Sequence, residues 1–132
     1  MKMKIFVCLA VCTSMLLGCS KDAEDAANSS GFSAADINGT WKEGTTGFTV
    51  RISGVSSGSM GRGTVYATGT AFPASALGGT CMKEVEFIRG GYWEAYNQSY
   101  TGSSWYQSHV IGLAMNDAKT EFKIGTKVYR RQ

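Results

Sequence analysis

An all-β fold of about eight antiparallel strands is what the sequence predicts for residues 37–132. Three observations point to it. Runs rich in β-branched and aromatic residues recur, short breaks of Gly, Ser and Asn separate them, and no stretch shows apolar residues at helical spacing. Strands joined by such short turns must pair antiparallel, because parallel pairing needs a long crossover. An up-and-down barrel is therefore expected, and a β-sandwich is the alternative.

Local sequence signals account for the expected strands and turns. Val50 and Ile52 alternate with polar residues, as in a half-buried strand, and Pro73 ends the third strand. Gly90 and Gly91 tolerate the positive φ of a tight hairpin turn. The strands are expected at 37–42, 48–53, 64–72, 81–89, 92–99, 105–115, 121–124 and 126–131.

The longest expected strand supplies candidate binding residues. Its Ile111 and Leu113 should face inward, and strict alternation then places Trp105, Gln107 and His109 on the same face toward one mouth of the barrel. An apolar cavity with a few polar groups is typical of a small-molecule site. Plain packing of these side chains is the alternative interpretation.

Tyrosines on the preceding strand form a second candidate surface. Tyr92, Tyr96 and Tyr100 share one strand face, and we take Tyr92 and Tyr96 as ligand-binding candidates. If these rings are exposed, they can instead stack on a glycan or contact a protein partner.

The chemistry needed for catalysis is sparse. His109 is the single His, and Cys81 is the one Cys after residue 36. We therefore expect no enzyme activity, metal or cofactor. Ten Lys or Arg against six acids give residues 37–132 a net charge of +4, which is too modest to indicate nucleic-acid binding.

The N-terminus resembles a bacterial lipoprotein signal. Lys2 and Lys4 precede a 13-residue, mainly apolar run that ends in Leu16-Leu17-Gly18-Cys19. This match to a lipobox implies that residues 1–18 are a signal peptide and that Cys19 carries fatty acyl chains. An ordinary secretory signal with an incidental Cys is the alternative. Residues 19–36, rich in small and polar residues, are expected to be the lipidated Cys and a flexible tether.

The residues after Cys19 bear on where in the cell the protein is sent. Ser20 in this position resembles lipoproteins sent to the outer membrane, and the acidic stretch 21–25 resembles export signals of Bacteroidetes-type surface lipoproteins. The resemblance implies an outer-membrane lipoprotein, on the periplasmic face or on the cell surface.

The two ends of the strand region resemble lipocalin-like domains. Gly39-Thr40-Trp41 matches their Gly-x-Trp opening, and Tyr129-Arg130 matches their closing strand. The resemblance implies that Trp41 closes the base of the barrel and that Arg130 packs over it. It also implies a non-catalytic barrel that binds a small apolar or amphipathic ligand. The alternative is a module that binds a protein or glycan through exposed aromatic rings.

Overall fold

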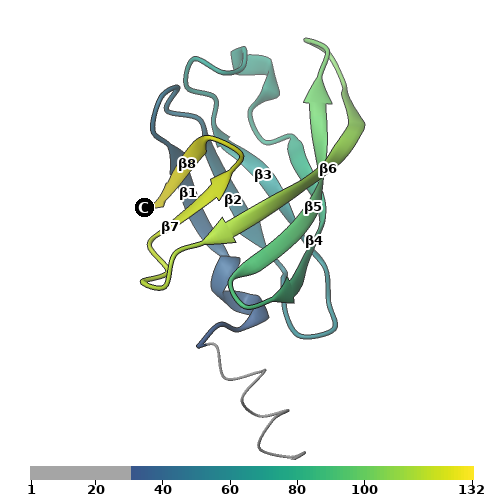
Figure 1. Ribbon diagram of the computed structural model, residues 1–132. Coiled ribbons are helices and arrows are strands. Elements are labelled where there is room, and N and C mark those ends of the chain that lie inside the picture. Colours follow the sequence, from purple (N-terminus) through teal and green to yellow (C-terminus); the bar gives the residue numbers. More distant parts are fainter. Residues whose placement is uncertain (1–30) are drawn as a thin grey trace, which may run out of the picture. The chain divides into compact units, whose positions relative to one another are not determined.

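The computed structural model describes residues 31–132, so Cys19 and the signal peptide expected over 1–18 lie outside the described residues. Eight strands form a closed barrel in which each strand pairs antiparallel with its neighbours in sequence, and β8 closes on β1 (Figure 1). The expected up-and-down, lipocalin-like barrel is confirmed, and the sandwich is not formed. The strands are β1 (Gly39–Glu43), β2 (Thr49–Ser53), β3 (Gly61–Ala67), β4 (Thr80–Arg89), β5 (Tyr92–Tyr100), β6 (Trp105–Met115), β7 (Glu121–Ile124) and β8 (Lys127–Arg131).

Strand β3 lies earlier in the chain than the sequence predicted. It begins at Gly61, before the expected start at residue 64. A Cβ at Gly63 would come within 2.9 Å of Val50 Cγ2 on the neighbouring strand. Glycine here permits close strand contact rather than a turn. Residues 68–72 leave the sheet, and a short 3-10 turn, η2 (Ala74–Ala76), follows Pro73.

One end of the barrel is sealed by the other 3-10 turn, η1 (Ala34–Ile37), which precedes β1. The fully buried indoles of Trp41 and Trp93 donate hydrogen bonds to the carbonyls of Ile37 (2.9 Å) and Ala34 (3.0 Å). Phe32 lies edge-on to Trp93, with ring centroids 6.3 Å apart. Residues 32–36 were expected to belong to the tether, and the structure corrects this: they are packed into the folded domain.

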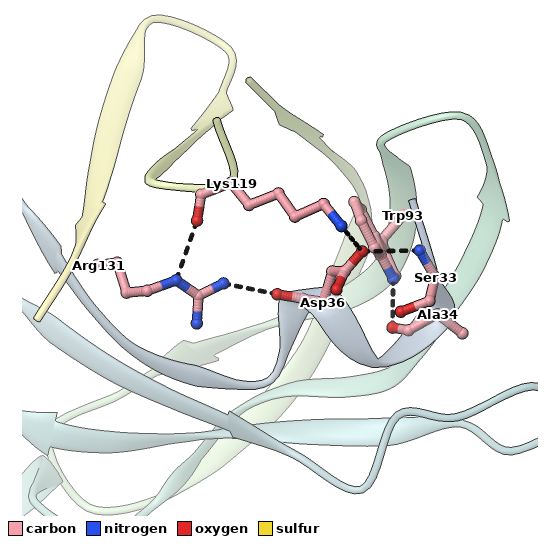
Figure 2. A network of polar contacts seen from close by, with 6 residues as sticks. All are labelled: Ser33, Ala34, Asp36, Trp93, Lys119 and Arg131. Carbon is pink, nitrogen blue, oxygen red and sulfur yellow. Dashed lines mark hydrogen bonds and ion pairs between the residues drawn. The ribbon is translucent and has the colours of Figure 1, made fainter. Parts of the chain in front are cut away.

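Arg131, on the last strand, holds η1 in place through hydrogen bonds and a ring contact (Figure 2). Its guanidinium lies 4.1 Å from the ring centroid of Trp41 and donates to the carbonyls of Asp36 (2.7 Å), Asn38 (3.0 Å) and Lys119 (3.0 Å). Lys119 also forms an ion pair with the Asp36 carboxylate at 2.8 Å. Backbone and side chains from three separate segments therefore meet at this sealed end.

The resemblance had assigned the stacking role to Arg130, and the structure corrects the position by one residue. Trp41 stands directly opposite Arg131 in the β1–β8 register, whereas Arg130 stands opposite Lys42. Directly opposed residues project to the same face of a sheet, so Arg131 reaches the Trp41 ring. Arg130 is exposed and instead pairs with Glu121 at 3.3 Å.

Strand β6 contains a β-bulge that changes its alternation. Tyr96 pairs with Val110 and Gln98 with Gln107, so β6 advances three residues where β5 advances two. The extra residue lies at Ser108–His109, and a bulge of this kind re-aims the side chains that follow it. Toward β7, the pairing comprises Ala114↔Lys123 and Met115↔Phe122.

None of the helical segments within residues 31–132 has the length and hydropathy needed to cross a membrane.

Candidate functional site: a cavity at the open end of the barrel

The end of the barrel opposite η1 holds a cavity of about 700 Å³. In an up-and-down barrel, the β1–β2, β3–β4, β5–β6 and β7–β8 connections all lie at one end, and the chain enters at the other (Figure 1). The cavity is lined by residues of the β1–β2, β3–β4 and β7–β8 connections and by residues of the strands around them. Its volume falls within the range of small-molecule sites.

Apolar side chains form one continuous part of the cavity wall. Phe48, Phe72, Met82, Ile111 and Ile124 all line it, and the rings of Phe48 and Phe72 meet edge to face at 5.2 Å. These residues come from five different segments, so the barrel must close before the wall is complete. Such a wall favours an apolar body over a fully polar one.

The floor of the cavity is aromatic. Tyr129 lines the cavity and stacks on Phe122 with ring centroids 4.8 Å apart. Phe122 in turn lies edge-on to Trp41 at 4.8 Å. This column of rings fills the barrel between the cavity and the sealed end.

Glu43 is a buried acid in the cavity wall that the sequence analysis missed. It is 3% exposed, and its carboxylate accepts hydrogen bonds from the Thr45 amide (2.9 Å), the Thr46 amide (2.7 Å) and the Thr46 hydroxyl (2.5 Å). These bonds, the Thr46 hydroxyl first, lower the pKa of Glu43 to about 2. The signal in the sequence was an acid followed by the Thr-rich turn 44–47, whose free amides need an acceptor.

Two further polar groups open into the cavity. Gln98 is 3% exposed, and its Nε2 donates to the Asn97 carbonyl at 3.3 Å. Tyr129 is 5% exposed, and burial raises the pKa of its hydroxyl to about 12. Neither Gln98 Oε1 nor the Tyr129 hydroxyl accepts or donates a hydrogen bond within residues 31–132, and in this part of the chain every fully buried side-chain N or O has a partner. Both atoms are therefore accessible from the cavity, which gives it unused hydrogen-bonding capacity.

Of the ligand-binding candidates on β6, only His109 lines the cavity. Its Nδ1 lies 3.0 Å from the hydroxyl of Ser108. Trp105 is half-buried and packs against Tyr100 (4.9 Å) and Phe72 (5.5 Å), behind the cavity wall. Gln107 is exposed and lies outside the cavity. The strict alternation assumed from the sequence is interrupted by the bulge at Ser108–His109.

The tyrosines on β5 do not form one binding surface. Tyr92 covers Gly112, where a Cβ would come within 2.8 Å of its ring carbons. Tyr96 is half-buried and lies outside the cavity lining. Tyr100 does line the cavity, and its hydroxyl is 2.9 Å from the Ser75 hydroxyl.

Cys81 also borders the cavity, with its thiol 3.4 Å from the Gly63 carbonyl. Burial raises the pKa of this thiol to about 12, so it keeps its proton at neutral pH. Residues 31–132 hold no group of three or more His, Cys, Asp or Glu side chains placed to share a metal ion.

Comparison of the chain with protein-family models, with curated proteins and with solved structures finds no match.

Proposed function

We propose that the protein is an exported, lipid-anchored, non-catalytic barrel that binds a small amphipathic ligand in its open-end cavity. The observation that carries this proposal is the cavity of about 700 Å³, which combines apolar side chains with polar atoms that have no hydrogen-bond partner within residues 31–132. Pockets of this kind bury most of a small ligand and orient it through a few polar contacts.

The non-catalytic part of the proposal rests on the groups at the cavity. The raised pKa values of Cys81 and Tyr129 keep both side chains protonated at neutral pH, which makes them weak nucleophiles and bases. Glu43 is fully ionised but already accepts three hydrogen bonds. These groups are suited to holding a ligand rather than transforming it.

The contacts of the tyrosines favour this proposal over a glycan- or protein-binding surface. Tyr92 is committed to covering Gly112, and Tyr100 to Trp105 and Ser75. Rings that are already engaged in packing offer little free area for stacking on a sugar.

Cavity binding can be tested with a matched pair of variants on β6. Ile111 lines the cavity and is 9% exposed, whereas its neighbour Val110 is 53% exposed on the outer surface. The neutral probe N-phenyl-1-naphthylamine should fluoresce more strongly with the wild-type protein and with Val110→Trp. Ile111→Trp should weaken the enhancement, because the larger ring projects into the cavity and takes up part of its apolar space.

Far-UV circular dichroism of both variants should retain the β-sheet spectrum. An unchanged probe response in a folded Ile111→Trp protein would contradict cavity binding, as would no response in the wild type. Native mass spectrometry of protein purified from its own host would then identify any ligand that it carries.

The lipid anchor is proposed from the lipobox alone and has its own test. Metabolic labelling with a radioactive fatty acid should mark the wild-type protein, and Cys19→Ser should remove the label. Cys81→Ser is the control and should keep the label. Labelling of the Cys19→Ser protein would overturn the anchor and leave the cavity proposal untouched.

A further inference from the structure

We propose that the cavity selects an organic cation, with its positive head directed to Glu43 and its apolar body against Phe48 and Phe72. This inference rests on the proposed cavity function and names the charge class of the ligand. It follows from the position of Glu43, from the aromatic wall and from the way the other charged groups are exposed.

Glu43 presents a negative charge that nothing in the described domain neutralises. Its three hydrogen-bond donors, from Thr45 and Thr46, are all uncharged. The ion pairs found within residues 31–132 are Lys119–Asp36 and Arg130–Glu121, and neither involves Glu43. At 3% exposure, the residue has little contact with bulk water.

A nearly buried charge without a counter-charge favours an incoming cation. A ligand cation that sits against Glu43 displaces water from between the two charges, and their Coulomb attraction is then stronger than between two fully hydrated groups. The three bonds to Thr45 and Thr46 leave part of the accepting capacity of the carboxylate free, because a carboxylate has about four lone-pair sites. An ammonium group placed there would complete its coordination.

The rings around the cavity reinforce the same preference. Tyr129 stands directly opposite Glu43 in the β1–β8 register, and Phe48, Phe72 and Tyr100 complete the aromatic part of the lining. The face of an aromatic ring attracts a cation, and the combination of several rings with a carboxylate is well suited to an ammonium or quaternary ammonium group.

Two other groups at the cavity, Lys127 and His109, can carry positive charge. Both are exposed, Lys127 at the start of β8 and His109 at the β6 bulge, so water screens them. A ligand anion could meet them at the mouth, but its apolar body would then lie beside the buried charge of Glu43. The buried charge therefore sets the preference, and the exposed ones modify it.

The test compares three ligands with the same ten-carbon chain, namely decyltrimethylammonium, decanoate and decanol. The two ions are titrated calorimetrically below their micelle concentrations and decanol below its solubility limit. Wild-type protein should bind the cation at least about tenfold more tightly than decanoate, as expected when a charge-assisted contact is gained. Glu43→Gln, which keeps the shape and one acceptor oxygen, should lose that preference while retaining decanol binding.

The matched control is Glu94→Gln, which changes the net charge equally at a half-buried β5 position outside the cavity lining. It should behave as the wild type does. Retained decanol binding shows that Glu43→Gln is folded. If decanol and the cation bind but Glu43→Gln leaves the preference unchanged, or if decanoate binds best, the charge inference is wrong and cavity binding stands. If none of the three ligands binds to the wild type, the proposed function itself fails.

Discussion

Replacing Arg131 with Met should destabilise the barrel far more than the same replacement of its neighbour Arg130. Arg131 donates to the carbonyls of Asp36, Asn38 and Lys119 and lies over the Trp41 ring. Arg130 forms an exposed ion pair with Glu121. Both substitutions remove one positive charge and keep a long apolar side chain, so the pair isolates the contacts.

The magnitude can be worked from these contacts. Each of the three hydrogen bonds contributes about 0.5 kcal/mol at the low end of the usual range, which suits a partly exposed donor. The cation–π contact adds about 0.5–1 kcal/mol. Arg131→Met should therefore lower the free energy of unfolding by about 2 kcal/mol, whereas loss of a surface ion pair in Arg130→Met should cost about 0.5 kcal/mol or less.

Urea unfolding of the full chain, followed by tryptophan fluorescence, measures both values because Trp41 and Trp93 report directly on the sealed end. A loss of about 2 kcal/mol corresponds to a fall in melting temperature of about 8–16 °C for a domain of about 100 residues. Equal losses in the two variants, or a larger loss in Arg130→Met, would refute the assignment of Arg131 as the residue that locks η1.

Three further predictions follow from the same structure. Gly39→Ala should also weaken the sealed end, by about 1 kcal/mol or more in urea unfolding, because Gly39 has φ +145° and a Cβ there would come within 2.7 Å of Arg131 Nη1; an unchanged midpoint would contradict this. Glu43 has a folded pKa of about 2, below its ordinary 4.5, so it stabilises the fold above pH 4.5 and this contribution is lost as the pH falls toward 2. The stability gap between wild type and Glu43→Gln should therefore be widest near pH 6 and close toward pH 2, and a gap that does not depend on pH would show that the charge is not involved. Cys81, with its pKa raised to about 12, should react slowly with a thiol reagent at pH 8 and quickly in urea; rapid labelling of the folded protein would show that the thiol is accessible.

The fold was predictable because the strand signals are local. The alternation around Val50 and Ile52 and the turn at Gly90-Gly91 each fix one element, and short connections then leave few topologies. The observed β6 and β7 bounds, Trp105–Met115 and Glu121–Ile124, coincide with those expected from the sequence.

The candidate site was less predictable because it depends on contacts between distant segments. The extra residue at Ser108–His109 interrupts the alternation of β6, and no feature of the neighbouring sequence indicates a bulge there. The register of β8 against β1 selects Arg131 rather than Arg130, which the sequence of β8 alone does not reveal. Glu43 looks like an ordinary surface acid beside Lys42 until the turn that follows folds back onto its carboxylate.

The 3-10 turn that seals the barrel is also the place where the chain enters it. The chain upstream of Gly31 is joined to the domain at this sealed end, opposite the cavity. If Cys19 carries a lipid, the anchored segment joins the barrel at its sealed end, at η1, and not at the cavity. A ligand would then exchange with the surrounding solution. A pulling force on the N-terminal segment would act first on the carbonyls of Ala34 and Ile37, which accept the hydrogen bonds of the two buried indoles.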